Sequence, residues 1–500
     1  MSLRDRVDLV RGRELTLGTL FERLARVHGD APLVEEDGDD GLRVSYATAA
    51  SLTARWAGAI QAKITPGDRV VIATPNGYAL VLLCCATSRA GGVPVPVNPK
   101  MRDDEIDHVV VDSEAAIVVR DTAELDGGEP IDAVPAEPGD VAALFYTSGT
   151  TGKPKGAQLT HRGLVGQAGR GALFPSKLRR DEAVTGMPVA HIAGFSMLVQ
   201  AAALGVPVYL LRKFRPDTAL DAIEQRKATV FIGVPAMYRM MDEAGADTRD
   251  LSSVRLWASG ADAMPFELAK KFQRMGASAT LPITGKPVGE AMFIDGYGMV
   301  ELGGGAALKV LPPLLPVGGA LAVPLPGFKM RVVDDAGREV AGGTVGELVV
   351  KGPGVMRGYH GQREATDDAL SADGWLRTGD LARRRRLGLL ELAGRKKDVI
   401  KHGGYSVFAS EVEAALGLHP SVAEAAVVGL TDARKGEVPV AAVILRDGHT
   451  LTEDELVAWA DERLSDYKVP RRILFVSELP RTGTDKVQKA ELKKQFVAGG

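Results

Sequence analysis

Apolar positions in the first 120 residues alternate between helical spacing and short runs rich in β-branched residues. Three segments with helical spacing are predicted to be helices: residues 17–27, 45–62 and 78–89. Four short apolar runs are predicted to be strands: residues 69–73, 91–97, 109–111 and 116–119. Helices that alternate with short buried strands are typical of a layered α/β architecture.

The pattern changes in the second half of the chain. Three stretches between turns alternate apolar and polar residues and predict an antiparallel β-subdomain: residues 325–333, 346–351 and 354–359. Further on, two helices and three strands are predicted: residues 410–416 and 452–464, and residues 425–429, 440–444 and 472–476. These last elements predict a compact α+β unit of about one hundred residues, which is an ordinary domain size.

Composition narrows the function classes. The chain has 500 residues, 45% of them hydrophobic, and a formal net charge of −3, which argues against a polyanion such as nucleic acid as the main partner. Its first residues are charged, unlike a signal peptide, and no apolar run reaches the length that spans a bilayer. The neighbouring Cys84 and Cys85 lie in an apolar helix and are expected to be reduced core residues. We therefore expect a cytoplasmic protein without a membrane span.

The segment from Tyr146 to Ala157 carries the clearest chemistry. It follows the predicted buried strand at residues 141–145 and combines glycines, hydroxyl side chains and two lysines. Glycine lets backbone N–H groups approach an anion, hydroxyls donate hydrogen bonds, and lysine adds a positive charge. This mixture predicts a polyphosphate-binding loop rather than a plain surface turn. It is not a Walker loop, because Pro154 follows Gly152-Lys153.

This loop resembles the phosphate loop of the adenylate-forming superfamily, which includes acyl-CoA synthetases, and further motifs of that superfamily follow in order. The resemblance implies ATP and Mg²⁺ as cofactors, and a large N-terminal α/β domain, residues 1–393, followed by a small mobile α+β domain, residues 394–500. It also implies that Thr147 takes part in catalysis. The residues implied to bind the ATP phosphates are Thr147, Ser148, Gly149, Thr150, Thr151, Gly152 and Lys155.

Two later motifs are expected to form the nucleotide pocket. Tyr297 offers a flat face to adenine, and Glu301 is a hard carboxylate ligand for Mg²⁺. By resemblance the nucleotide also contacts residues of two glycine-rich turns: Gly260, Ala261, Asp262, Gly296, Gly298 and Met299. The superfamily usually has Thr or Ser where this chain has Val300, so one hydroxyl contact is lost. The segment from Ala279 to Ala291 is longer than expected and receives no role.

The acyl pocket is expected to be apolar, which favours a fatty or aryl acid. Its expected lining residues are His191, Phe195, Val234, Trp257 and Gly303, and His191 is also expected to serve catalysis. Peptide-synthetase relatives carry an aspartate in the motif of His191, and its absence disfavours an amino acid substrate. Malonyl-CoA synthetases carry an arginine where this chain has Gly296, which disfavours a dicarboxylate, although Arg239 keeps that alternative open.

The remaining motifs lie near and beyond the expected domain boundary. By resemblance Asp380 accepts hydrogen bonds from the ribose hydroxyls, Arg395 contacts the nucleotide, and Lys397 is the hinge. Gly403 and Gly404 are expected beside the pantetheine arm of coenzyme A. Near the end of the chain, Lys486 matches the catalytic lysine that stabilises charge on the α-phosphate.

Two departures from the superfamily pattern, Asp485 beside this lysine and Ala409 in place of proline, remove no catalytic group. The sequence therefore predicts an AMP-forming acyl-CoA synthetase whose partners are a small carboxylic acid, ATP and CoA. An enzyme that loads an acyl carrier protein would share every motif and remains the alternative.

Overall fold

The computed structural model describes most of the chain, and these residues divide into two compact units. The described ranges are residues 15–98, 101–147, 154–166, 181–262, 264–281, 284, 286–311, 321–385, 388–432, 434–481 and 487–498. The first unit holds the described residues up to 147 with residues 154–329 and 351–374, and the second holds residues 330–350 and 375–498. The expected boundary at residues 393 and 394 lies inside the second unit and stays a prediction.

The first unit is organised around a mostly parallel sheet with the strand order β16-β15-β14-β11-β10-β8-β9-β1-β2. Its strands are β1 (Pro32–Glu36), β2 (Arg43–Ser45), β8 (Ala183–Thr185), β9 (Val208–Leu210), β10 (Val230–Gly233), β11 (Leu256–Gly260), β14 (Met292–Met299), β15 (Gly304–Leu311) and β16 (Leu321–Pro324). Strands β10, β11 and β14 are parallel neighbours, with Gly233 beside Ser259 and Gly260 beside Gly296. The carboxyl ends of these strands therefore meet at one edge, where ligands bind in open α/β sheets.

A smaller parallel sheet, β4-β3-β5, and a separate antiparallel hairpin, β6–β7, complete the strands of this part of the unit. The strands are β3 (Arg69–Ile72), β4 (Val93–Pro96), β5 (Ala115–Val119), β6 (Val141–Tyr146) and β7 (Gly156–Thr160). Leu144 of β6 packs against Val71, Val95 and Val109 in one hydrophobic cluster. This packing holds the hairpin, and with it the phosphate-loop segment, against the small sheet.

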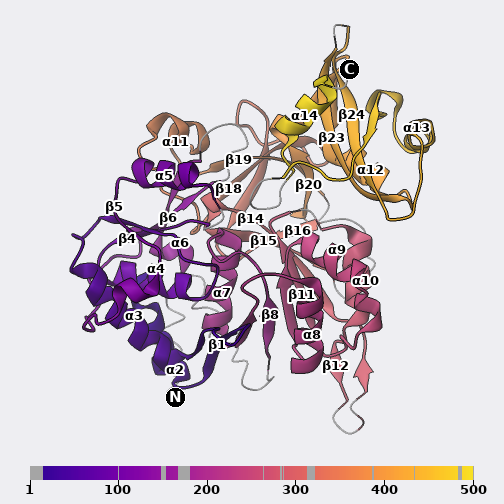
Figure 1. The fold of residues 1–500 in the computed structure, drawn as a ribbon. Coiled ribbons are helices and arrows are strands. Elements are labelled where there is room, and N and C mark those ends of the chain that lie inside the picture. The colour runs from indigo at the N-terminus through magenta and orange to yellow at the C-terminus, as the bar shows by residue number, and fades with distance from the viewer. Residues whose placement is uncertain are drawn as a thin grey trace. The chain divides into compact units, whose positions relative to one another are not determined.

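Ten helices among the described residues surround these sheets (Figure 1). They are α2 (Leu20–His28), α3 (Tyr46–Gln61), α4 (Ala79–Arg89), α5 (Asp103–Asp112), α6 (His161–Leu164), α7 (Ile192–Leu204), α8 (Pro216–Arg226), α9 (Pro235–Glu243), α10 (Phe266–Met275) and α11 (Arg363–Ala369). Proline begins α8 and α9, where its missing N–H group costs no helical hydrogen bond. Ser45 begins α3, because its side chain accepts a hydrogen bond from the N–H of Thr48.

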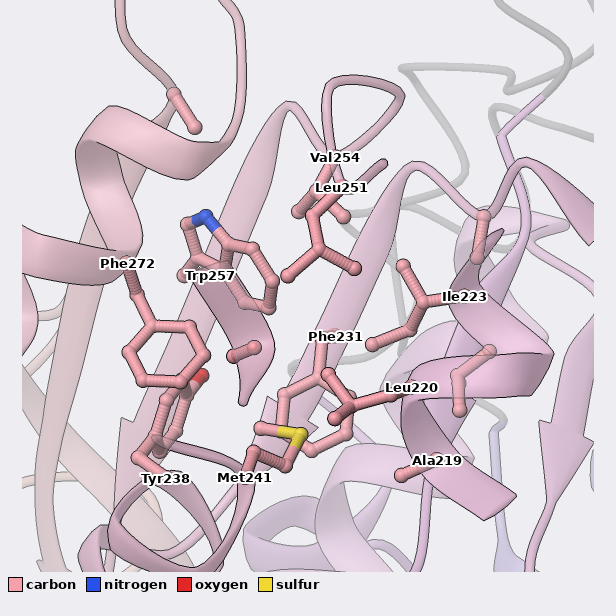
Figure 2. Close-up of a cluster of buried hydrophobic side chains, with 14 of the residues drawn as sticks. Ala219, Leu220, Ile223, Phe231, Tyr238, Met241, Leu251, Val254, Trp257 and Phe272 are labelled. Carbon is pink, nitrogen blue, oxygen red and sulfur yellow. The ribbon is translucent and has the colours of Figure 1, made fainter. Parts of the chain in front are cut away.

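The core of the main sheet lies between its strands and helices α8, α9 and α10. Aromatic side chains fill this space, and Figure 2 shows Trp257 of β11 beside Phe272 of α10, with Tyr238 of α9 and Phe231 of β10 close by. The rings of Trp257 and Phe272 meet edge to face, with 5.1 Å between their centroids. Trp257 is fully buried in this cluster, which makes it a core residue.

One predicted strand is a helix. Residues 109–111 belong to α5, where Val109 is fully buried and Val111 is 75% exposed. A strand would place these two side chains on the same face, whereas a helix separates them. Asp103, Asp104 and Glu105 in the first turn favour the helix through its dipole, and Ile106 and Val109 supply its buried stripe. The apolar run of three residues is shorter than one helical turn, so it could not show the helical repeat.

The segment for which the sequence suggested no role forms a small exposed hairpin. Strands β12 (Ala279–Thr280) and β13 (Pro287–Val288) pair antiparallel, with Ala279 beside Val288. All four residues are exposed, and the hairpin extends from the unit below α10 in Figure 1. At its base, the Ser278 hydroxyl donates to the Val288 carbonyl oxygen at 2.9 Å.

The second unit contains four neighbouring strands in the order β17-β18-β19-β20. It also contains a separate sheet in the order β22-β21-β24-β23, with β25 beside β24. The strands are β17 (Lys329–Val333), β18 (Val345–Lys351), β19 (Leu376–Arg384), β20 (Leu390–Arg395), β21 (Val399–His402), β22 (Tyr405–Phe408), β23 (Val422–Asp432), β24 (Gly436–Leu445) and β25 (Ile473–Phe475). Helices α12 (Ala409–Gly417), α13 (Glu453–Asp461) and α14 (Lys489–Ala498) cover the second sheet through two hydrophobic clusters.

The third stretch of the predicted β-subdomain is not a strand. Residues 354–359 form a loop of the first unit whose only ladder contact is a single bridge between Tyr359 and Ala157 of β7. Gly354 and Gly358 are close to backbone or side-chain neighbours that leave no room for a Cβ atom, so tertiary packing sets this path. In the parts of the chain that the structure describes, no helix has the length and apolar character needed to span a bilayer.

Candidate active site

The ends of the phosphate loop are joined directly. Thr147 follows β6 and Lys155 precedes β7, and the Thr147 N–H donates to the Lys155 carbonyl at 3.0 Å. The Lys155 N–H also faces the Thr147 hydroxyl oxygen at 3.4 Å. The strands continue this pairing, with Tyr146 beside Gly156. The hairpin stem is therefore closed at Thr147 and Lys155, while Ser148, Gly149, Thr150, Thr151 and Gly152 lie outside the described residues.

Helix α5 holds the same stem from the side. The Tyr146 hydroxyl donates to Asp112 Oδ2 at 2.7 Å, and His108 Nε2 lies 3.3 Å from the Pro154 carbonyl oxygen. Burial and the Asp112 carboxylate raise the pKa of Tyr146 far above its usual range, so its phenol stays a donor. The roles of His108 and Asp112 could not be predicted from the sequence, because the valine run in their helix predicts a strand.

Glu301 lies in a short 3₁₀ helix, η6 (Val300–Leu302), directly after β14. The residue is only 7% exposed, and its Oε1 accepts a hydrogen bond from the Tyr359 hydroxyl at 2.8 Å. Gly303 ends η6 in the left-handed conformation, with φ of +66°, where a Cβ would press on the Gly163 and Gly354 carbonyls. Within the described ranges, no lysine or arginine forms an ion pair with Glu301.

Tyr359 links this carboxylate to the phosphate-loop stem. The ammonium group of Lys155 lies 5.1 Å from the centroid of the Tyr359 ring, within the range of a cation–π contact. The sequence contained no signal for Tyr359, which is 58 residues from Glu301 and 204 from Lys155. Lys155, Tyr359 and Glu301 therefore form one connected group in the first unit.

The two glycines at the strand ends leave space on their open side. A Cβ atom at Gly260 would meet nothing closer than the Gly296 carbonyl oxygen at 3.4 Å, and one at Gly296 nothing closer than 3.6 Å. Packing around a Cβ atom therefore does not require glycine at either position. Gly298 differs, because its Cβ would lie 1.9 Å from the Gly304 carbonyl oxygen.

The turn that follows β11 is strained. Ala261 has φ of +70°, a left-handed conformation that is uncommon for residues with a Cβ atom. Such strain costs about 1–2 kcal/mol and persists only where the surrounding structure enforces it. Asp262, next in the turn, is exposed. The strain is located where the sequence predicts that the nucleotide binds.

A buried ion pair supports β14 below these glycines. Lys309 Nζ lies 3.0 Å from Asp295 Oδ2, and both side chains are almost fully buried on directly paired positions of β15 and β14. Burial raises the pKa of Asp295, and Lys309 opposes that rise. Tyr297 is 9% exposed. Met299 is half-buried at the end of the strand. How Tyr297 and Met299 meet a nucleotide stays a prediction.

The residues expected to line an acyl pocket have different surroundings. His191 caps α7, because its Nδ1 accepts a hydrogen bond from the Ala193 N–H at 3.2 Å, and the ring proton is therefore on Nε2. Phe195 is fully buried against Phe145 of the phosphate-loop hairpin. Val234 is half-buried at the start of α9. Their part in a substrate pocket stays a prediction, as does that of Trp257, which the core packing already explains.

In the second unit, two predicted nucleotide residues are cross-strand neighbours. Asp380 of β19 is paired with Arg395 of β20, and Arg395 Nε lies 3.0 Å from Asp380 Oδ1. Asp380 is 8% exposed, and its N–H donates to the Thr378 hydroxyl oxygen at 3.1 Å. Desolvation lowers the pKa of Lys397 in the following 3₁₀ helix, η8 (Lys396–Asp398). Gly403 and Gly404 both have left-handed backbones, with φ of +55° and +85°.

The residues on either side of the expected catalytic lysine pair with each other. Lys486 lies outside the described residues, but Arg481 and Val487 on either side of that segment form an antiparallel bridge. The Gln488 N–H donates to the Pro480 carbonyl at 2.7 Å, and Lys489 Nζ lies 2.8 Å from Glu413. These contacts anchor both ends of the loop within the second unit.

The donor set fits a magnesium ion bound mainly by substrate. No cluster of three or more His, Cys, Asp or Glu side chains suited to a metal occurs among the described residues. Mg²⁺ in nucleotide enzymes needs no such cluster, because one or two carboxylates and the substrate phosphates hold it together with water. A buried carboxylate without a described cationic partner, as at Glu301, is such a ligand.

Comparison with known proteins supports the same assignment. The sequence model of the AMP-binding enzyme family matches residues 21–131 and 120–360, and that of the AMP-binding enzyme C-terminal domain matches residues 411–486. Feruloyl-CoA synthase of an Amycolatopsis species is 35% identical, over 97% of this chain and 100% of that protein.

Two solved structures share the fold over nearly the whole chain. The o-succinylbenzoate CoA synthetase of Bacillus subtilis, in complex with the acyl-adenylate intermediate OSB-AMP, has a TM-score of 0.82 at 27% identity and covers 95% of this chain and 98% of its own. ATP-bound MatB of Rhodopseudomonas palustris has a TM-score of 0.83 at 29% identity, with 96% and 99% covered.

The fold and the relatives define an AMP-forming acid–thiol ligase of the acyl-CoA synthetase type. Within that class, the chain belongs to the AMP-binding enzyme family. The predicted superfamily, the mixed α/β fold with a small C-terminal α+β part, and the enzyme class are confirmed.

Proposed function

We propose that the protein joins an aryl carboxylic acid to CoA, using ATP and Mg²⁺, through an acyl-adenylate. The observation that carries this proposal is the end-to-end match to a feruloyl-CoA synthase, since ferulate is an aryl acid. The relative solved with OSB-AMP also takes an aromatic acid. An apolar pocket, as expected from the sequence, would suit such a substrate. Fatty acids, which the sequence favoured equally, take second place.

In the proposed first half-reaction, the substrate carboxylate attacks the α-phosphorus of ATP and pyrophosphate leaves. The nucleophile is already ionised, so positioning and charge neutralisation do most of the catalytic work. Thr147, Lys155 and the loop residues between them would hold the phosphates at the closed hairpin stem. Glu301 would bind Mg²⁺, which neutralises phosphate charge when bound. Lys486 would stabilise the charge on the α-phosphate.

The nucleoside would be held by groups that the sequence motifs predict. The open sides of Gly260 and Gly296 would admit adenine, with Ala261, Tyr297 and Gly298 around it. Asp380 would accept hydrogen bonds from both ribose hydroxyls. Its pairing with Arg395 supports this role, because the guanidinium fixes the orientation of the carboxylate.

In the proposed second half-reaction, the CoA thiolate attacks the acyl carbonyl and AMP leaves. Lys397 would serve as the hinge between the two half-reactions, and Gly403 and Gly404 would lie beside the pantetheine arm. The left-handed backbones of both glycines favour this reading, since other residues rarely adopt them. His191 and Phe195 would face the acyl group.

The experiment is pyrophosphate release from ATP with a panel of hydroxycinnamic, other aryl, fatty and dicarboxylic acids, each with and without CoA. We expect release with aryl acids and thioester formation when CoA is present. Release with fatty or dicarboxylic acids alone would overturn the substrate class. Accumulation of acyl-adenylate without thioester in the presence of CoA would indicate that a carrier protein, and not CoA, accepts the acyl group.

Substitution of the expected catalytic lysine tests the site itself. Lys486→Ala should lower pyrophosphate release by about 10²–10³, the usual cost of removing one group that stabilises transition-state charge. Thioester formation from supplied acyl-adenylate should be retained. The matched control is Lys494→Ala in α14, whose exposed ammonium lies 2.7 Å from Glu491 Oε1 in the same helix. If both variants lose the same share of pyrophosphate release, Lys486 is not the catalytic lysine.

A further inference from the structure

Tyr359 is held more firmly than a loop residue usually is. Its loop runs antiparallel along β7: the Gln158 N–H donates to the Gly358 carbonyl, the Arg357 N–H to the Gln158 carbonyl, and the His360 N–H to the Gly156 carbonyl, all within 2.8–2.9 Å. On the other side, the Tyr359 N–H donates to the Thr366 hydroxyl oxygen of α11 at 2.9 Å. Its backbone is thus fixed between the phosphate-loop hairpin and a helix.

The same loop also holds the backbone of Glu301. The Met356 N–H donates to the Glu301 carbonyl oxygen at 2.9 Å, three residues before Tyr359 donates to the Glu301 side chain. One short segment therefore contacts both the main chain and the carboxylate of the residue expected to bind Mg²⁺. It also carries the ring beneath the Lys155 ammonium.

The chemistry of the phenol suits an orienting role. The Tyr359 hydroxyl lies 2.8 Å from Glu301 Oε1 and donates its proton to this hydrogen bond, since a carboxylate only accepts. A neutral donor fixes the carboxylate without cancelling its charge, whereas a lysine or arginine would compete with a metal cation. The aromatic face beside it attracts the Lys155 ammonium without forming a salt bridge.

We propose that Tyr359 is a positioning residue: its hydroxyl orients the Glu301 carboxylate for Mg²⁺, and its ring seats the Lys155 ammonium for the ATP phosphates. This inference rests on the proposed function, in which Glu301 is the metal ligand. Lys155 and Glu301 are far apart in the sequence, but the Tyr359 side chain contacts both of them. Loss of the hydroxyl should weaken metal binding, and loss of the ring should weaken binding of the ATP phosphates.

The hydroxyl is tested by direct binding of Mn²⁺, followed by electron paramagnetic resonance, in the presence of a non-hydrolysable ATP analogue. Tyr359→Phe should weaken Mn²⁺ binding by about tenfold, as removal of groups that orient metal ligands typically does. The matched control is Tyr46→Phe, which also loses a buried phenol bond of 2.8 Å, here to the Ala202 carbonyl. We expect less than a twofold change in that variant. Equal changes in both variants would overturn the proposal.

A double-mutant cycle separates this inference from the proposed function. Glu301→Gln should abolish most of the Mn²⁺ affinity, and adding Tyr359→Phe to it should change nothing further, because the oriented carboxylate is already absent. If Glu301→Gln leaves Mn²⁺ binding intact, the metal role of Glu301 fails. If it weakens binding and Tyr359→Phe does not, only the role of Tyr359 fails.

The ring is tested by binding of the same ATP analogue without metal. Tyr359→Leu removes the aromatic face and should weaken the affinity by about threefold, consistent with a partly exposed cation–π contact. Tyr359→Phe keeps the ring and should bind the analogue as the unmodified protein does. Thermal unfolding of each variant shows whether it is folded, and equal affinities in Leu and Phe variants would contradict the role of the ring.

Discussion

Glu301 in the first unit and Asp380 in the second are both buried carboxylates, with 7% and 8% of each residue exposed, yet their partners differ. Glu301 accepts a hydrogen bond from the neutral Tyr359 hydroxyl. Asp380 is paired with the guanidinium of Arg395 at 3.0 Å. The partner of the first is therefore a neutral donor, whereas the partner of the second is a cation.

The difference shows how the same side-chain chemistry is prepared for two tasks. A carboxylate oriented by a neutral donor is suited to a metal ion, because no fixed cation has to be displaced. A carboxylate paired with arginine is suited to accept hydrogen bonds from neutral hydroxyls, because its charge is stabilised before the ligand arrives. The partner, and not burial, therefore distinguishes the two expected roles.

The largest expected effect comes from neutralising Glu301. Glu301→Gln should lower Mg²⁺-dependent pyrophosphate release by about 10²–10³, because the amide cannot replace a charged metal ligand. The free energy of unfolding should not fall, since the change removes a buried charge. Kinetic assays and urea unfolding measure the two quantities.

Arg395→Ala removes the cation of a pair, whereas Glu301→Gln removes the charge of a carboxylate. The free energies of unfolding of the two variants are compared. Arg395→Ala removes the guanidinium that pairs with the Asp380 carboxylate, and it should lower the free energy of unfolding by about 1 kcal/mol, a modest value because the Arg395 side chain is 45% exposed. If Glu301→Gln destabilises the protein as much as Arg395→Ala does, the contrast between the two carboxylates is wrong.

A buried histidine beside the phosphate-loop hairpin extends the comparison to pH. His161 is 3% exposed, its Nδ1 accepts the Leu17 N–H at 3.0 Å, and burial lowers its pKa from 6.5 to about 4. Between these values the unfolded chain binds more protons, so stability should fall as pH decreases from 6.5 to 4, by about 3 kcal/mol in total.

Urea unfolding at several pH values, compared with His161→Asn, measures this contribution. The variant keeps an acceptor for the Leu17 N–H but has no group that titrates. We expect its stability to depend less steeply on pH over this range. Identical pH profiles would show that His161 is not responsible.

The smallest expected effects concern two left-handed residues next to the predicted nucleotide carboxylates. Ala261 has φ of +70° beside Asp262, and Gly379 has φ of +68° beside Asp380. Ala261→Gly should raise the free energy of unfolding by about 0.5–1 kcal/mol by relieving strain, whereas Gly379→Ala should lower it by a similar amount. Thermal unfolding measures both, and the same sign in the two variants would refute the strain at Ala261.

Several features could be predicted from the sequence because their signals are local. Helical spacing placed α3 and α4 to within one or two residues, and short apolar runs located β3 and β6. The phosphate-loop motif could be recognised because its glycines, hydroxyls and lysines are contiguous. The prediction was wrong at residues 109–111, because three consecutive valines predict a strand although the longer segment is a helix.

Tertiary structure alone decided which distant residues meet. Tyr359 lies in a stretch predicted to be a strand, and nothing in its neighbourhood indicates a contact with Glu301 or Lys155. The partner of each buried carboxylate, the strain at Ala261 and the free space beside Gly260 likewise depend on strands and loops far apart in the sequence. The sequence by itself thus determined the chemical groups and their order, because both can be identified from contiguous residues. Folding decided their partners, since hydrogen bonds and ion pairs depend on distances in space.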